Sequence, residues 1–74
     1  MPDIWAKMAA RWPSAIVSRH EVGRFTGGAV SSKSIANLDC EGTGPKGRFN
    51  IGRKVVYPVD TLVFWLRGRA EGVK

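Results

Sequence analysis

The chain contains a single cysteine, Cys40, among its 74 residues. No intramolecular disulfide can form, which excludes a small secreted fold held together by disulfides. We expect Cys40 to be a small residue that is buried or half-buried. The only histidine, His20, is expected at the surface. These two residues do not make up a ligand set, so the sequence predicts neither a metal nor another cofactor.

Long apolar runs are also missing. No run approaches the ~18 residues of a transmembrane helix, and the start of the chain lacks the apolar core of a signal peptide. We therefore expect a cytoplasmic protein with no membrane partner. The acids are scattered singly, and with one His and one Cys they offer no paired set of titratable groups for catalysis. The sequence therefore indicates that the protein is not an enzyme.

Acidic residues are scarce. Six Asp and Glu stand against twelve Lys and Arg, which gives a net charge of +6 and a pI near 10.3. A pI above ~9 favours a polyanionic partner. Charge alone leaves open a nucleic acid, a ribosomal site, a membrane surface or simply a solvated basic surface. The length allows one domain, in which a small core buries only ~60% of the unfolded surface.

The most informative segment begins at Gly44. Two runs rich in β-branched and aromatic residues, 48–51 and 54–57, flank Gly52-Arg53. A glycine at the first central position predicts a hairpin with a type II′ turn. No acid lies between Glu41 and Asp60 to offset the basic residues expected on the strands and at the tip of this hairpin, which are Lys46, Arg48, Arg53 and Lys54.

A helix is predicted to follow the hairpin directly. Pro58 suits its first turn, Asp60 suits the dipole at its start, and Gly68 is the expected stop. Residues 69–74 would form a frayed tail. The apolar face falls at i, i+3 and i+4, with Trp65 expected in the core, and consists of Leu62, Trp65 and Leu66 with Val59 and Phe64 flanking them.

An amphipathic helix is predicted over residues 1–13. Asp3 can cap it and Pro13 ends it. Its apolar stripe has a spacing of four, and Lys7 and Arg11 lie off that stripe. We expect the helix to pack on the domain or to mediate self-association, with a mobile arm as the third possibility. The stripe consists of Ile4, Met8 and Trp12.

Two further short helices are predicted between these segments. Ser18 and Glu21 match a capping box for a helix over 19–26, with Val22 and Phe25 facing inward. Gly27-Gly28 then breaks the chain. A second helix starts at Ser31 or Ser32, turns Ile35 and Leu38 inward, and ends by Glu41-Gly42, while Asp39 and Glu41 add negative charge at its far end.

Two short helices around a glycine turn form the helix-turn-helix pattern, although a simple helical hairpin has the same signature. The basic hairpin and the closing helix that follow favour a winged helix. The predicted fold class is therefore α+β. It is a small winged helix-turn-helix over residues 14–68, with two short helices, a two-stranded wing hairpin, a closing C-terminal helix and an extra N-terminal helix.

From Ile16 to Leu66 the sequence resembles the MerR-type winged-helix family of phage excisionases and AlpA-type prophage regulators. The resemblance is carried by Ser18 with Glu21, Ser31-Ser32, Gly44-Pro45, Arg48, Ile51-Gly52-Arg53, Tyr57 and Trp65-Leu66.

This resemblance implies sequence-specific binding of double-stranded DNA by a prophage-type regulator or an excisionase-like recombination accessory factor. It implies cooperative assembly on DNA, or a phage recombinase as a partner. Small subunits of some phage terminases carry a similar domain, so a DNA-packaging factor is an alternative. A protein-interaction module is another.

Binding roles follow from side-chain chemistry. Lys33 can pair with guanine and Asn37 with adenine in the major groove, while Arg53 at the wing tip can instead enter a narrow minor groove. Each assignment has a simpler alternative, such as a helix cap, a solvated amide or protection of a sheet edge. Serines at a helix start can donate to phosphate or bases, namely Ser31, Ser32 and Ser34. Cations that neutralise phosphates would be Arg19, Lys46, Arg48, Arg53 and Lys54.

Overall fold

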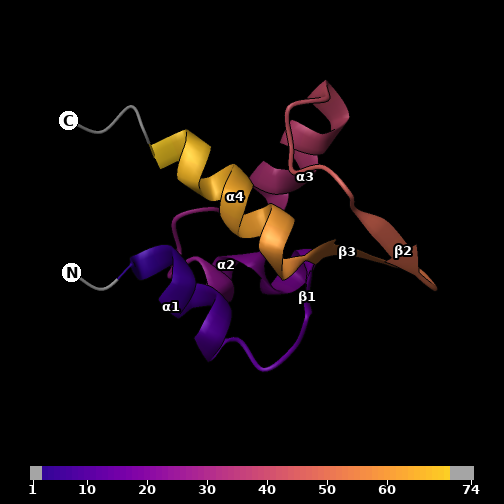
Figure 1. Cartoon of the computed structure of the whole chain (residues 1–74). Coiled ribbons are helices and arrows are strands. Elements are labelled where there is room, and N and C mark those ends of the chain that lie inside the picture. The colour runs from indigo at the N-terminus through magenta and orange to yellow at the C-terminus, as the bar shows by residue number, and fades with distance from the viewer. Residues whose placement is uncertain (1–2, 71–74) are drawn as a thin grey trace.

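The computed structural model describes residues 3–70 of the chain. Within that range it is a compact α+β fold with four α-helices and a three-stranded antiparallel sheet (Figure 1). In chain order the elements are α1 Ile4–Arg11, β1 Ile16–Ser18, the 3₁₀ turn η1 Arg19–Glu21, α2 Val22–Phe25, α3 Ser32–Glu41, β2 Phe49–Ile51, β3 Lys54–Pro58 and α4 Val59–Arg69.

Local capping signals set most helix ends where the sequence predicts them. The Asp3 carboxylate accepts a hydrogen bond from the Trp5 amide at 3.0 Å, and the Ser31 hydroxyl accepts one from the Ser34 amide at 3.1 Å. Gly42 ends α3 with φ +83°, a conformation that only glycine adopts readily. The predicted stop at Gly68 is wrong, because α4 continues through Gly68 to Arg69. Residues 71–74 of the predicted tail lie outside the described residues.

The predicted first helix over 19–26 is shorter and less regular than expected. It consists of the 3₁₀ turn η1 and the single turn α2. The Ser18 side chain caps no backbone amide. Instead its hydroxyl donates to Glu21 Oε1 at 2.8 Å, and this hydrogen bond lowers the pKa of the Glu21 carboxyl. The two side chains of the predicted capping box therefore bind each other, and the Ser18 hydroxyl does not cap the helix.

The sheet has the strand order β1-β3-β2. Asn50 pairs with Val55, and the two-residue loop has Gly52 at φ +62°, so the predicted hairpin is confirmed. Strand β1 was not predicted; it pairs with β3 through Val17 and Tyr57. Lys46 and Arg48 precede β2, which corrects their expected placement on a strand.

The core lies between the sheet and the helices. Tyr57, Val17, Val22, Ile35 and Leu62 are fully buried, and Phe25, Val56, Val59 and Leu66 nearly so. Helix α1 packs on α4 beside this core (Figure 1). Trp5, Met8 and Ala9 of α1 and Trp12, directly after it, pack against the core, whereas Ile4 of the predicted stripe is 59% exposed.

Two burial predictions are wrong, those for Cys40 and Trp65. Cys40 is exposed, because α3 turns Ile35 and Asp39 inward and the next residue lies about 100° further round the helix. Trp65 is half-buried at the edge of the core rather than inside it. Phe64, expected beside the apolar face of α4, is 79% exposed. No helix among residues 3–70 combines the length and apolar character needed to cross a membrane.

Candidate nucleic-acid interface

A basic groove lies between the start of α3 and the tip of the β2–β3 hairpin. It encloses about 340 Å³ and is lined by seven residues, none of them acidic. Four cations thus converge from η1, α3 and the hairpin, although they lie far apart in the sequence. This wing groove, as we call it, is lined by Arg19, His20, Ser32, Lys33, Arg53, Lys54 and Val55.

The N-terminal turn of α3 supplies one wall of the wing groove. It carries no acidic residue, so the partial positive charge of the helix end is not offset. Ser31 is occupied as the cap, and its hydroxyl also donates to Ser34 Oγ at 3.0 Å. Lys33, Ser34 and Asn37 are exposed, and Lys33 has no ion pair with another described residue. The exposed face of α3 therefore offers an unpaired cation beside polar side chains.

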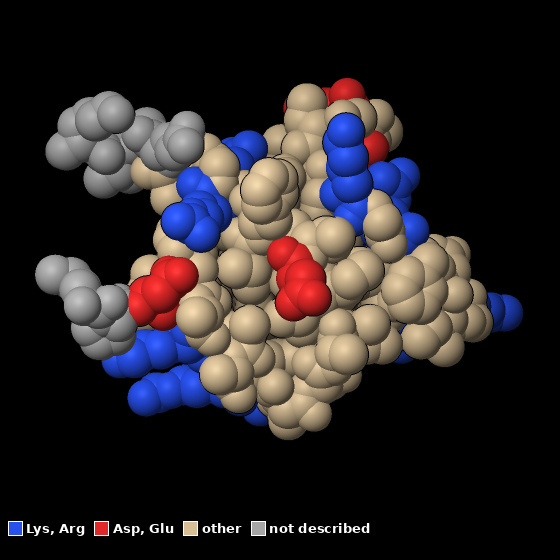
Figure 2. Space-filling view, in the orientation of Figure 1, with Lys and Arg blue, Asp and Glu red and all other residues tan. Residues whose placement is uncertain are grey.

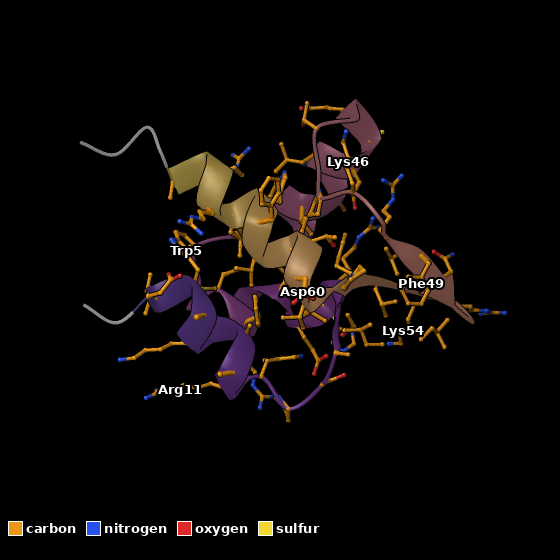
Figure 3. The ribbon with its side chains drawn as sticks, in the orientation of Figure 1. Trp5, Arg11, Lys46, Phe49, Lys54 and Asp60 are labelled. Atoms are coloured by element: carbon orange, nitrogen blue, oxygen red, sulfur yellow. The ribbon has the colours of Figure 1, made fainter. Side chains whose placement is uncertain are left out.

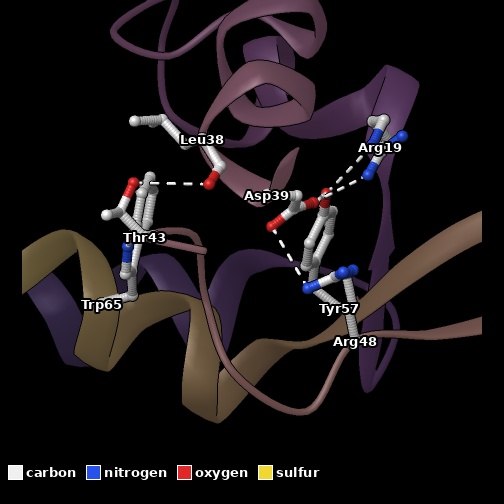
Figure 4. Close-up of polar contacts among 7 residues, drawn as sticks. All are labelled: Arg19, Leu38, Asp39, Thr43, Arg48, Tyr57 and Trp65. Atoms are coloured by element: carbon white, nitrogen blue, oxygen red, sulfur yellow. Dashed lines mark hydrogen bonds and ion pairs between the residues drawn. The ribbon is translucent and has the colours of Figure 1, made fainter. Parts of the chain in front are cut away.

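Asp39 is the central residue of a buried ionic cluster (Figure 4). Its side chain is 3% exposed, and Oδ2 lies 2.7 Å from an Arg19 guanidinium nitrogen. The same oxygen accepts a hydrogen bond from the Tyr57 hydroxyl at 2.5 Å. The expectation that Asp39 adds negative charge at the end of α3 is therefore wrong, because the carboxylate is buried, paired with Arg19 and hydrogen-bonded by Tyr57.

The contacts of the cluster shift the pKa values of Arg19 and Tyr57. Arg19 Nε donates to the Tyr57 hydroxyl at 3.1 Å, and this hydrogen bond, followed by that to Asp39, raises the pKa of Arg19. Burial, followed by the hydrogen bond to Asp39, raises the pKa of Tyr57. Arg19 thus remains charged and immobile, with 30% of its side chain exposed at the border of the wing groove.

The second carboxylate oxygen of Asp39 faces the loop that leads into β2. Oδ1 has no hydrogen-bond partner within the described chain, and Arg48 lies 3.8 Å away as an ion pair. Gly44 packs directly on this carboxylate, where a Cβ atom would overlap it, and Pro45 beside it is buried. The Gly44-Pro45 motif therefore closes the loop over Asp39.

Lys46 lies away from the wing groove. It borders a different hollow, beside α4, with Thr61, Phe64 and Trp65, and Figures 2 and 3 show this face, with Lys46 labelled above α4. The structure therefore brings five of the predicted residues together in the wing groove, namely Arg19, Ser32, Lys33, Arg53 and Lys54. Ser31, Ser34 and Asn37 lie at the start and on the exposed face of α3. Lys46 and Arg48 lie outside the groove.

Sequence reasoning missed His20 as a groove residue and both Asp39 and Tyr57 as the anchor of Arg19. One signal was present: Asp39 follows Ile35 by four residues and so shares its buried face.

Comparisons with protein-family models, with curated proteins and with solved structures find no match.

Proposed function

We propose that this chain is a small winged helix-turn-helix domain that binds double-stranded DNA. Helix α3 enters the major groove and the β2–β3 hairpin acts as the wing. The observation that carries the proposal is the wing groove, in which cations from three elements line one concave surface without an acid. A surface of this kind attracts the phosphate backbone.

The hairpin has the shape that a wing requires. It projects from the body of the molecule (Figure 1), and all three residues of β2 are exposed. Arg53 and Lys54 at its tip are exposed as well and would contact phosphates, with a minor-groove position open to Arg53. Lys33 and Asn37 would reach base edges from α3.

The Asp39 cluster supports a rigid arrangement of these parts. It joins α3 to η1 through Arg19, to β3 through Tyr57 and to the loop before β2 through Arg48. Recognition helix and wing are thereby held in one geometry before DNA binds. Arg19 and Arg48 would serve mainly in this framework, with only their exposed surfaces left for phosphate.

The exposed face of α3 carries a single cation, Lys33. A helix with so few basic side chains suits weak binding by one molecule and cooperative binding by neighbouring copies. Recognition helices of the excisionase family usually carry more Arg and Lys, so α3 departs from the family pattern here. Cooperative assembly on adjacent sites, which excisionases use as a group, would compensate for this.

The test is binding to duplex DNA across a salt series, with the wild type compared with Arg53→Gln/Lys54→Gln. Each phosphate contact contributes about 0.9 to the slope of log affinity against log salt. The double variant should bind more weakly, with a slope smaller by about 2. Arg67→Gln, an exposed site on α4, is the control and should leave affinity and slope nearly unchanged.

Two results would contradict the proposal. Wild-type protein that binds no duplex even at low salt would exclude DNA binding as the function. An unchanged salt slope in the folded double variant would show that the wing does not touch phosphates. Circular dichroism spectra of all variants would confirm that the fold is intact.

A further inference from the structure

A second basic surface lies on the N-terminal helix, away from the wing groove. Lys7 and Arg11 of α1 and Arg24 of α2 surround a groove of about 470 Å³, floored by Trp12 and Phe25. We call it the α1 groove. Figure 3 shows Arg11 at one end of the molecule and Lys54 toward the other, and Figure 2 shows basic side chains gathered beside α1. The two grooves share no lining residue.

The three cations of the α1 groove have no ion-pair partner among the described residues. Glu21, on the turn before α2, accepts a hydrogen bond from the Ser18 hydroxyl at 2.8 Å. It is not within ion-pair distance of Arg24, although the charge of Arg24 contributes to the lowered pKa of the Glu21 carboxyl. Unpaired cations that face one cavity repel each other, so an anion placed among them would be stabilised.

The floor of this groove is rigid. The Arg24 guanidinium lies over the Trp12 ring at 5.8 Å from its centroid. The Trp12 ring packs edge-on against Phe25, with centroids 5.2 Å apart, and its Nε1 donates to the Ile16 carbonyl at 2.9 Å. Arg24 is thus held in place before any ligand arrives, which lowers the entropy cost of binding.

The spacing along α1 suits a nucleic-acid strand. Lys7 and Arg11 are four residues apart, which places them about 6 Å apart along the helix axis. A DNA strand carries one phosphate per ~3.4 Å of helix axis. Two flexible cationic side chains at this separation can therefore each contact a phosphate of the same strand.

We propose that the α1 groove binds the phosphodiester backbone of a second DNA duplex, so that one molecule joins two duplexes. The proposal rests on the proposed function, in which the wing groove holds the first duplex. In Figure 3, Arg11 of the α1 groove and Lys54 of the wing groove lie toward opposite sides of the molecule, whose longest extent is 39 Å. A protein with two such surfaces brings separate DNA segments together, as assembly of a recombination or repression complex requires.

The experiment measures energy transfer between donor-labelled and acceptor-labelled short duplexes mixed with the full chain. The wild type should produce transfer. Lys7→Gln/Arg11→Gln should reduce it to background while the affinity for a single duplex changes by about twofold or less, since exposed charges beyond ~8 Å are screened at physiological salt. Arg24 is kept because it stacks on Trp12, and Arg67→Gln is the control that should retain both activities.

The possible failures are distinguishable. Wild-type protein that binds duplexes without transfer overturns this inference and leaves the proposed function intact. Transfer that persists in Lys7→Gln/Arg11→Gln also overturns it, because self-association rather than the α1 groove would then join the duplexes. If that variant loses single-duplex affinity as strongly as the wing variant, both grooves serve one duplex and the inference is wrong. Absence of any DNA binding overturns the proposed function itself.

Discussion

Asp39 links α3 to three other parts of the fold through its buried carboxylate. Its buried carboxylate accepts hydrogen bonds from Tyr57 and Arg19. Asp39→Ala would leave the Tyr57 hydroxyl and the Arg19 guanidinium without their acceptor. Removing one partner of a buried ion pair costs about 3 kcal/mol, so we expect the free energy of unfolding to fall by about that amount. Urea denaturation measures it.

Glu41 provides the matched control for this prediction. It lies on the same helix as Asp39 but is exposed, and it forms no ion pair with the described residues. Glu41→Ala should change the free energy of unfolding by less than about 0.5 kcal/mol. Equal costs for Asp39→Ala and Glu41→Ala would show that the cluster contributes nothing to stability.

Tyr57 makes stability depend on pH in the alkaline range. Burial raises the pKa of its hydroxyl above the ordinary value of 10.0, so the folded state retains the proton more tightly than the unfolded chain. The stabilisation is present in full below pH 10 and is lost as the pH rises from there toward the folded-state pKa. Unfolding midpoints should therefore fall more steeply above pH 10 in the wild type than in Tyr57→Phe, which lacks the titrating group. Parallel pH profiles for the two proteins would contradict this account.

At the scale of elements, α4 is joined to the end of α3 by Trp65. Its Nε1 donates to the Thr43 carbonyl at 2.8 Å, and Arg69 lies over its ring at 5.1 Å. Because Trp65 is half-buried, Trp65→Ala should cost about 2–3 kcal/mol, below the ~3–5 kcal/mol of a core aromatic. Thermal unfolding compared with Phe64→Ala, whose side chain is 79% exposed and should contribute little, tests this. A similar cost at both positions would contradict the half-buried placement.

The elements that sequence predicted correctly are those with local signals. Asp3 and Ser31 bind amides two and three residues away, and Gly52 sets a two-residue turn. Strand β1 was missed because its three residues become a strand only by pairing with β3, far along the chain. The burial of Asp39 was missed for the same reason, since its partners Arg19 and Tyr57 come from other elements.

The candidate site was also predictable only where local sequence signals define it. Basic residue types and the hairpin tip could be read from the sequence, and Arg53 and Lys54 do lie together in the wing groove. Their assembly with Lys33 depends on how α3 packs against the sheet, which no short pattern encodes. Lys46 was grouped with them by proximity in sequence, whereas the chain carries it toward α4.

At the scale of the whole molecule, the N-terminal helix is part of the folded unit rather than an appendage. Trp12, directly after α1, packs on Phe25 and its indole donates to the Ile16 carbonyl, while Trp5 and Met8 of α1 lie against the core. A mobile arm would leave these side chains in water and would uncover one side of a core that is already small. We therefore expect α1 to unfold together with the rest of the domain.

This expectation can be tested with Trp12 as the only tryptophan, in the variant Trp5→Phe/Trp65→Phe. Two-state unfolding requires that different probes report the same transition. Trp12 fluorescence, which senses α1, and far-UV circular dichroism, which senses all helices, should give coincident urea curves. The control keeps Trp65 instead, in Trp5→Phe/Trp12→Phe, so that fluorescence senses α4. A Trp12 transition at lower urea than the dichroism curve would show that α1 detaches first, in which case the α1 groove would not exist as a fixed surface.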